Sequence, residues 1–221
     1  MPAVIVTGVG TDIGKTYVSA SIIRALRAHE VPVDAFKPVI SGYDPDQAEA
    51  SDAGVLLAAL GEPVTPETLN AMSPFRYAAP LSPPLAAARE GRSIRFADVA
   101  GACRERAADA GRALLLIEGA GGVMSPLSDG ATVLDLIEAL DAPVLLVTGT
   151  YLGAISHTLT AVEVLRRRGV TIRAVVINEN EGSGTTLEEM HESLRVLAGG
   201  VPVFSVERGG EIPEEMLRLL F

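Results

Sequence analysis

Short apolar runs alternate along the chain with longer segments in which apolar residues recur at helical spacing. The runs are apolar on both faces, so they predict strands buried on both sides of a sheet. Segments of helical length separate them, which is typical of a parallel sheet covered by helices on both faces. The predicted strands span residues 3–7, 33–36, 113–117, 143–147, 173–177 and 201–205, and the predicted helices span 15–29, 52–60, 97–110, 133–140, 153–168, 186–197 and 213–220.

Length and composition limit the number of domains. The chain has 221 residues, of which 48% are hydrophobic and 21% charged. These values suit one compact globular domain and exclude collagen, coiled-coil and disordered chains. Two proline-rich stretches, 61–66 and 73–84, follow a part of the chain with too few strands to bury its own core. We therefore interpret them as a surface excursion from a single α/β domain over residues 1–221, with three α/β/α layers and a central, mostly parallel sheet.

Charge and cysteine content narrow the partners and the compartment. The formal net charge is -10, which argues against a broad basic surface for nucleic acid. Cys103 is the only cysteine and has no partner for an internal disulfide, so we expect a reducing compartment. Residues 1–7 lack the basic segment of a signal peptide, and no run approaches the ~18 apolar residues that span a bilayer. We expect a cytoplasmic protein that binds neither nucleic acid nor membrane.

The first predicted strand leads into a glycine-rich loop, Gly8-Val-Gly-Thr-Asp-Ile-Gly14-Lys15-Thr16, and then into a helix. The backbone N–H groups of such a loop and of the helix start bind an anion, the lysine reaches terminal phosphates, and the threonine hydroxyl ligates magnesium. Val9 stands where the usual motif has glycine, so the loop is a variant. An ordinary tight turn is the alternative, but the position between the first strand and the first helix favours nucleotide binding and a fold of the P-loop NTPase type.

The basic residues are almost all arginine. Of the 18 lysines and arginines, only Lys15 and Lys37 are lysine, and a compact ammonium neutralises charge differently from a planar guanidinium. Lys37 follows the second predicted strand and Ser41 lies in the next loop, at the edge where parallel sheets bind ligands. Lys37 is therefore a candidate to neutralise a transferred phosphoryl group from the side opposite Lys15. The alternative is an exposed lysine after a strand.

Two carboxylates are candidate ligands of magnesium, which prefers oxygen ligands. Glu118 closes the third predicted strand and is followed by glycines up to Gly122, a position equivalent to the acidic end of a Walker B strand. Asp52 follows Ser51 at a predicted helix start, where both residue types are mostly caps. Together with Thr16, Asp52 and Glu118 form the predicted metal site.

Two further positions follow predicted strands. The helix start from Leu152 through Gly153 to His157 offers free N–H groups to an anion. His157 is either a catalytic residue or, as such histidines more often are, an ordinary helix residue. Asn178 follows the fifth predicted strand, where its amide offers the donor and acceptor needed to read an adenine edge.

Taken together, these residues resemble the dethiobiotin synthetases, ATP-dependent enzymes of biotin synthesis. The match spans most of the chain, and the order and spacing of its motifs make it specific. The matching residues are Thr7-Gly8, Thr11, Gly14-Lys15-Thr16, Lys37-Pro38-Val39, Ser41-Gly42, Ser51-Asp52, Pro80, Ser82-Pro83, Glu90-Gly91, Glu118-Gly119-Ala120-Gly121-Gly122, Pro126-Leu127, Leu152-Gly153 and His157.

The resemblance implies a homodimer that closes a ureido ring on 7,8-diaminononanoate with CO2 and ATP, with Mg2+ as the metal. In that family one substrate amine captures CO2 as a carbamate. The carbamate oxygen then attacks the γ-phosphate to give a carbamic-phosphoric anhydride, and the second amine displaces phosphate. Such a reaction depends on positioning and electrostatics and needs no enzyme nucleophile.

The resemblance also implies a role for each matching residue. Lys15 and Lys37 would stabilise the carbamate and the transferred phosphoryl group, while Thr11, Ser41 and the backbone at Gly121 would hold the carbamate. The metal ligands would be Thr16, Asp52 and Glu118, and Asn178 would face adenine. Further nucleotide contacts are expected from Asp12, Ile13, Gly14, Tyr17, Glu118 and Gly121, and substrate contacts from Ser41, Gly121, Leu152, Gly153 and Ser156.

Two departures from the family pattern concern affinity and nucleotide specificity. The family binds the substrate carboxylate at the helix start of the partner subunit, where relatives usually carry asparagine and this chain has Ser156. A serine hydroxyl and backbone N–H groups can still serve there. The tail after Phe204 lacks the expected adenine-side pattern, so no contacts are assigned to it.

Two other classes of protein remain open. A ligase that forms amides on corrinoid substrates has a similar domain, but that family draws ammonia from a glutaminase domain with a nucleophilic cysteine, and Cys103 lies in a helical pattern without a partner. A switch ATPase of the partitioning type carries an extra lysine five residues before the phosphate lysine, where this chain has Gly10. Such ATPases also tend to show a basic or amphipathic element.

Overall fold

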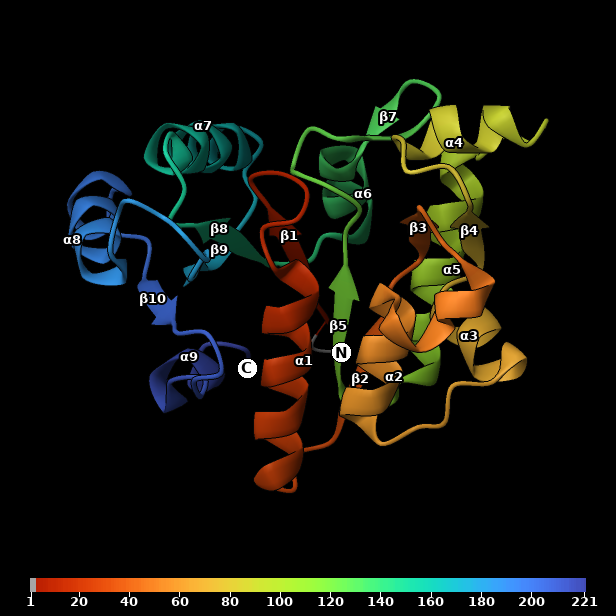
Figure 1. Ribbon diagram of the computed structural model, residues 1–221, viewed down its shortest axis with the longest axis horizontal. Helices are drawn as coiled ribbons and strands as arrows, with labels where there is room; N and C mark the ends of the chain where they lie inside the picture. Colours follow the sequence, from red (N-terminus) through yellow and green to blue (C-terminus); the bar gives the residue numbers. More distant parts are fainter. Residues whose placement is uncertain (1–2) are drawn as a thin grey trace.

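The central sheet has six strands, all parallel to their neighbours, in the computed structural model, which describes residues 3–221 (Figure 1). The strands are β1 (Ala3–Gly8), β2 (Val33–Phe36), β5 (Leu114–Glu118), β8 (Val144–Gly149), β9 (Ile172–Asn178) and β10 (Val203–Val206). Their order is β10-β9-β8-β1-β5-β2. All six strand predictions are therefore confirmed, while Met1 and Pro2 of the predicted domain lie outside the described residues.

Helices cover both faces of this sheet. Those that match a predicted helix are α1 (Lys15–Ala28), α2 (Asp52–Leu60), α5 (Phe96–Asp109), α6 (Val133–Leu140), α7 (Ala154–Arg167), α8 (Leu187–Leu197) and α9 (Glu214–Arg218). Ile5 of β1 belongs to one core with α5, α6, α7 and α8, whereas its neighbours Val4 and Val6 belong to a second core with α1, α2 and α9. The three-layer α/β/α prediction is thus confirmed. Within the described residues, no helix combines the length and apolarity that crossing a bilayer requires.

The chain between β2 and α5 contains elements that the sequence pattern did not predict. They are β3 (Val39–Ser41), the 3-10 helix η1 (Pro45–Ala50), α3 (Pro66–Met72), β4 (Phe75–Tyr77) and α4 (Pro83–Arg89). β3 and β4 pair in a two-stranded parallel sheet. The prediction of a surface excursion does not hold throughout residues 73–84, because Tyr77 at the end of β4 and Ser73 before β4 are fully buried. Strands of three residues are too short to show a period in the sequence.

The register of the sheet brings three strand ends to one edge. Val6 of β1 pairs with Glu118 of β5, and Gly8 pairs with Val147 of β8. Phe36, the last residue of β2, pairs with Ile117. The loop after β1, the segment after β2 and the loop after β5 therefore meet at the carboxyl edge, where sheets of this kind bind ligands. The last of these loops carries a small antiparallel pair, β6 (Pro126–Ser128) and β7 (Ala131–Thr132).

Candidate active site

A cavity of about 730 Å³ lies at the carboxyl edge of β1, β2 and β5. Residues 80–83, at the start of α4, and residues 125–126, after β5, form part of its wall. Because its lining comes from five separate segments, the cavity exists only in the folded chain. The predicted site residues that line it are Thr11, Asp12, Gly14, Lys15, Thr16, Lys37, Ser41, Asp52, Glu118 and Gly121.

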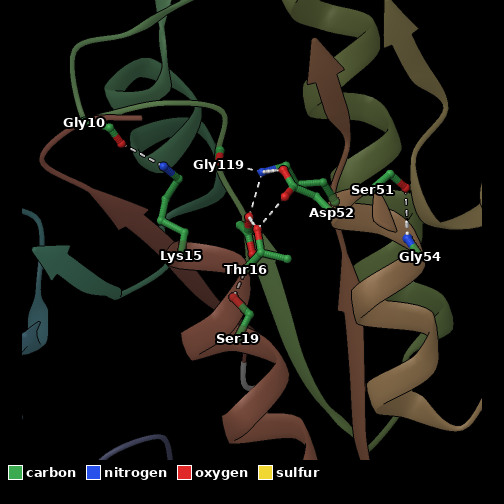
Figure 2. A network of polar contacts seen from close by, with 10 residues as sticks. Gly10, Lys15, Thr16, Ser19, Ser51, Asp52, Gly54 and Gly119 are labelled. Atoms are coloured by element: carbon green, nitrogen blue, oxygen red, sulfur yellow. Dashed lines mark hydrogen bonds and ion pairs between the residues drawn. The ribbon is translucent and has the colours of Figure 1, made fainter. Parts of the chain in front are cut away.

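The glycine-rich loop ends where α1 begins. Gly14 precedes the helix in the left-handed conformation, with φ 88° and ψ 26°, which glycine adopts without a steric penalty. The amide nitrogen of Asn178 donates to the carbonyl of Ile13 at 3.2 Å. Lys15 is buried, and its Nζ donates to the carbonyl of Gly10 at 2.8 Å (Figure 2). The loop therefore presents a helix start and a lysine to an anion in the cavity.

Beside this loop lies a group of five side chains that we call the carboxylate cluster: Thr16, Ser19, Lys37, Asp52 and Glu118. Thr16 Oγ1 lies 2.7 Å from Asp52 Oδ1 and 2.7 Å from Glu118 Oε1 (Figure 2). Lys37 Nζ lies 2.7 Å from Glu118 Oε1 and 2.9 Å from Asp52 Oδ2. Ser19 Oγ donates to Glu118 Oε2 at 2.8 Å. The two carboxylates thus connect α1, the helix after the glycine-rich loop, to Lys37, which follows β2.

Local structure explains why these side chains converge. Glu118 is the last residue of a fully buried strand, and Thr16 and Ser19 lie three residues apart on the same face of α1. Asp52 is the first residue of α2, whose N-terminus is capped by Ser51 through a hydrogen bond from the Gly54 N–H to Ser51 Oγ at 3.1 Å. The cap function therefore belongs to Ser51, and Asp52 faces the cluster.

The charges in the cluster affect the two lysines in opposite directions. Burial is the largest influence on Lys37 and would lower its pKa, but Glu118 and Asp52 together raise that pKa to about 12. Burial, followed by repulsion from Lys37, lowers the pKa of Lys15 from 10.5 to about 8. Burial would raise the pKa of Asp52, but the charge of Lys37 lowers it. Lys37 is therefore a permanent ammonium, whereas Lys15 titrates near the upper end of the physiological range.

The loop after β5 has a backbone shaped by two glycines and a serine. Gly121 is left-handed, with φ 71°, and a Cβ added there would overlap Ser125 Oγ. That hydroxyl accepts a hydrogen bond from the Gly122 N–H at 2.7 Å. Neither Ser125 nor Ser19 is among the site residues predicted from the sequence. Ser19 could have been found from its place one helical turn after Lys15, whereas nothing local signals Ser125.

Two predicted carbamate contacts lie on the cavity wall. Ser41 Oγ is buried and has no hydrogen-bond partner among residues 3–221, so it is available to a polar ligand. Thr11 is exposed at the mouth of the same cavity. The Gly42 N–H donates to the carbonyl of Ala79 at 3.0 Å, and Pro80 packs against Gly42. These contacts hold the start of residues 80–83 beside Ser41.

The predicted contacts at the start of α7 do not line this cavity. Leu152 is 98% exposed, Gly153 precedes α7 with φ 95°, and Ser156 is exposed. His157 shares a hydrogen bond of 2.9 Å between its Nδ1 and the hydroxyl of Tyr151, which favours the interpretation of an ordinary helix residue. A single chain therefore does not bring the start of α7 to its own lysines.

Two predicted nucleotide contacts have structural partners as well. The side chain of Ile13 is buried in the core beneath the loop, so only its backbone can reach a nucleotide. The hydroxyl of Tyr17 accepts a hydrogen bond from the Gly209 N–H at 2.7 Å and donates to the carbonyl of Glu207 at 3.3 Å. Tyr17 thus connects α1 to the loop after β10.

The donor set of the cluster fits magnesium. Thr16, Asp52 and Glu118 offer one hydroxyl and two carboxylates, the hard oxygen ligands that this ion prefers. In the part of the chain that the structure describes, no three His, Cys, Asp or Glu side chains converge on a metal position. Magnesium often binds through one or two carboxylates together with phosphates and water, so a larger carboxylate set is not needed.

Comparison with known proteins decides the family. A family model described as an AAA domain, AAA_26, matches residues 2–215. The chain is 54% identical over 222 residues to the ATP-dependent dethiobiotin synthetase BioD of Methylobacterium nodulans, with 98% of each chain covered. It belongs to the dethiobiotin synthetase family. The BioD protein of Phenylobacterium zucineum is also 54% identical, over 93% of this chain and 88% of that relative, so this resemblance is confirmed.

Solved structures place this dethiobiotin synthetase family member among P-loop folds. The MinC:MinD cell division protein complex of Aquifex aeolicus matches with a TM-score of 0.57 and 12% identity, over 99% of this chain and 86% of that chain. A ParA family ATPase from Chlorobium tepidum matches with a TM-score of 0.56 and 14% identity, over 100% and 89%. At such low identity the likeness shows the fold alone, and it confirms the P-loop NTPase type. It gives no support to the switch ATPase alternative.

Proposed function

We propose that the cavity described above closes the ureido ring of dethiobiotin from 7,8-diaminononanoate, CO2 and ATP. By its family the protein is an ATP-dependent ligase of biotin synthesis. One observation carries the location of the reaction: Lys15, Lys37 and the ligand set Thr16, Asp52 and Glu118 line a single cavity. Two cations and two carboxylates at one point suit the transfer of a phosphoryl group.

In this proposal the phosphates of ATP bind the loop of residues 8–16. The amine of Lys15 gives up its hydrogen bond to the carbonyl of Gly10 and donates to the phosphates instead. Lys15 takes this role because it is the only positively charged residue of the loop. Thr16, Asp52 and Glu118 hold Mg2+, which neutralises phosphate charge when it is bound. Asp12, Ile13, Gly14, Tyr17, Gly121 and Asn178 are the further nucleotide contacts, with Asn178 facing adenine.

Lys37, Ser41, Thr11 and the backbone of Gly121 hold the substrate carbamate. The hydroxyl of Ser41, which has no hydrogen-bond partner among residues 3–221, and the buried ammonium of Lys37 supply a neutral and a charged donor to the same cavity. The carbamate oxygen attacks the γ-phosphate, the bond from the γ-phosphorus to ADP breaks, and ADP leaves. The second amine then attacks the carbonyl carbon of the anhydride, phosphate leaves, and the amine loses a proton. The protein contributes positioning and charge stabilisation.

The site is completed, in this proposal, by a second subunit. Leu152, Gly153 and Ser156 at the start of α7 do not reach the cavity of their own chain, yet a helix start is a good place for a carboxylate. A homodimer would bring that helix start to the partner's cavity, where it would hold the carboxylate of 7,8-diaminononanoate. Leu152, which is 98% exposed, would be buried against the other copy in this dimer.

Three expectations about the surroundings of the enzyme stay predictions. They are a cytoplasmic location, the absence of nucleic-acid partners and the absence of membrane partners.

Burial raises the pKa of the Cys103 thiol to about 12, so this cysteine is a core residue without nucleophilic character.

The test is phosphate release from Mg-ATP and bicarbonate by the purified protein, with and without 7,8-diaminononanoate, together with mass analysis of the product. We expect phosphate release that depends on the diamine, and a cyclised product of the mass of dethiobiotin. Hydrolysis without the diamine, or no hydrolysis at all, would contradict the proposal while leaving the phosphate loop in place.

A further inference from the structure

The ammonium of Lys37 lies among the oxygen atoms that the proposed function assigns to the metal. Its Nζ is 2.7 Å from Glu118 Oε1, 2.9 Å from Asp52 Oδ2 and 3.3 Å from the carbonyl oxygen of Gly119. Figure 2 shows the carboxylate of Asp52 directed at the hydroxyl of Thr16. Glu118 Oε1 is shared, since it also lies 2.7 Å from Thr16 Oγ1.

Every carboxylate oxygen of the cluster lies within hydrogen-bond distance of a donor. Lys37 contacts Asp52 Oδ2 and Glu118 Oε1, and Ser19 donates to Glu118 Oε2. The single hydroxyl proton of Thr16 serves either Asp52 Oδ1 or Glu118 Oε1, each 2.7 Å from Thr16 Oγ1. A magnesium ion binds oxygen at about 2.0–2.1 Å. An ion that close to Glu118 Oε1 and Asp52 competes with the ammonium for the same two carboxylates, because two cations held beside the same oxygens repel each other.

Charge balance favours the exchange of one cation for the other. The two carboxylates carry two negative charges, and Lys37, only 3% exposed, neutralises one of them. A divalent ion would neutralise both. The ammonium of a lysine is carried on a flexible four-carbon stem. It can therefore change its position by rotation about the bonds of that stem while the backbone stays in place. Ser41, whose buried hydroxyl lacks a partner within the described residues, lines the same cavity as Lys37.

We propose that the ammonium of Lys37 is the built-in counter-ion of the metal site and that metal binding displaces it toward the part of the cavity that Ser41 lines. This inference rests on the proposed function, because it takes the metal ligands from there. It adds an order of events: Lys37 becomes available to the carbamate and the transferred phosphoryl group only after the metal has taken its place. A lysine that is released in this way cannot neutralise a phosphate that arrives without its metal.

The composition of the chain makes the proposal directly measurable. Because Lys15 and Lys37 are the only lysines, protein made with isotopically labelled lysine gives two ε-carbon signals in nuclear magnetic resonance. The Lys15→Arg variant assigns them. We expect the Lys37 signal of the full-length protein to stay in place when a non-hydrolysable ATP analogue is added with a chelator, and to move when Mg2+ follows. A Lys37 signal that does not move with Mg2+ would overturn the proposal.

A second measurement separates displacement from general electrostatics. Lys15→Met and Lys37→Met each remove one positive charge near the same carboxylates, since both charges act on Asp52. We expect Lys37→Met to bind Mg2+ about tenfold more tightly than the wild type, and Lys15→Met to change the affinity clearly less. Equal gains in both variants, or no gain in Lys37→Met, would contradict the proposal. Calorimetry of Mg2+ binding without nucleotide provides the affinities.

Failure of this inference can be distinguished from failure of the proposed function. Neither measurement depends on turnover, because both detect the lysine or the metal directly. If phosphate release depends on the diamine but the Lys37 signal does not shift with Mg2+, only the displacement of Lys37 is overturned. If the Lys37 signal shifts with Mg2+ but the protein makes no cyclised product, the displacement stands and the proposed reaction is overturned.

Discussion

The side-chain amide of Asn178 lies directly against the α-carbon of Gly14. A Cβ added at Gly14 would overlap the amide nitrogen of Asn178, which donates its hydrogen bond to the neighbouring carbonyl of Ile13. The end of β9 therefore holds the last turn of the phosphate loop before α1 begins. Glycine is therefore required at this position for two separate reasons. Its backbone is left-handed, and a side chain there would overlap Asn178.

We expect Gly14→Ala to lose ATP binding and stability together. The left-handed conformation alone costs a non-glycine residue about 1–2 kcal/mol, and the overlap must also displace Asn178 from Ile13. Thermal unfolding and calorimetric titration with ATP measure the two effects. Gly10→Ala is the matched control, because a Cβ at Gly10 meets nothing within 4 Å. Equal unfolding temperatures for the two variants would contradict the explanation.

Ser19 is expected to act as a positioning residue for the metal site. Its hydroxyl donates to Glu118 Oε2 at 2.8 Å inside the core, and a hydrogen bond to a charged group contributes about 1.5–3 kcal/mol. Ser19→Ala should therefore raise the Mg2+ concentration needed for half-maximal phosphate release by about tenfold or more. The rate at saturating Mg2+ should change much less.

A neighbouring serine provides the control for this variant. Ser21 lies two residues further along α1 and makes no side-chain hydrogen bond with the residues that the structure describes. Ser21→Ala should leave the dependence on Mg2+ unchanged. If Ser19→Ala behaved in the same way, Glu118 would not need this hydrogen bond to hold the ion.

The sequence predicts the main sheet well because each of its strands is apolar on both faces and each is separated from the next by a helix. It does not predict β3 and β4, whose three residues pair only with each other. At the site, Lys37 and Glu118 are predictable because Lys37 follows one strand and Glu118 ends another, and the two strand ends meet at one edge. Ser125 is not, because its importance comes from the backbone of Gly121 and Gly122, whose φ and contacts exist only in the folded loop.

Lys37→Arg is expected to keep ATP binding and to lose most synthesis. Lys37 is fully buried against Glu118 and Asp52, and a planar guanidinium cannot fit or move where a compact ammonium does. Loss of a donor to developing charge costs about a hundredfold or more in rate. Titration with ATP measures the retained binding, and diamine-dependent phosphate release measures the lost synthesis. Turnover at the wild-type rate would contradict the role of Lys37.

The affinity for ATP is expected to fall as the pH rises above about 8. Burial and the charge of Lys37 lower the pKa of Lys15 to about 8, so below this pH the free enzyme already carries the ammonium that binds phosphate. Above it Lys15 is neutral, and binding requires the uptake of a proton. The pKa of Lys37, at about 12, keeps that residue charged throughout.

Titrations with ATP from about pH 7 to about pH 9 test whether the affinity falls as the pH rises. The control is Lys15→Arg, whose guanidinium stays charged over the whole range. Its affinity will be lower than that of the wild type, but it should show a flatter profile. A wild-type profile as flat as that of the variant would show that Lys15 does not titrate there.

Leu152 provides the test of the shared site. Its side chain is 98% exposed at the start of α7, and the proposed dimer would bury it against a second copy. Leu152→Asp should weaken the dimer by about tenfold or more, because a buried charge without a partner opposes association. Specific activity should then rise with protein concentration. Val196, 68% exposed on α8, is the matched control, and Val196→Asp should leave both properties unchanged. Light scattering at assay concentration measures the mass, and a fully active monomer would rule out a site shared between subunits.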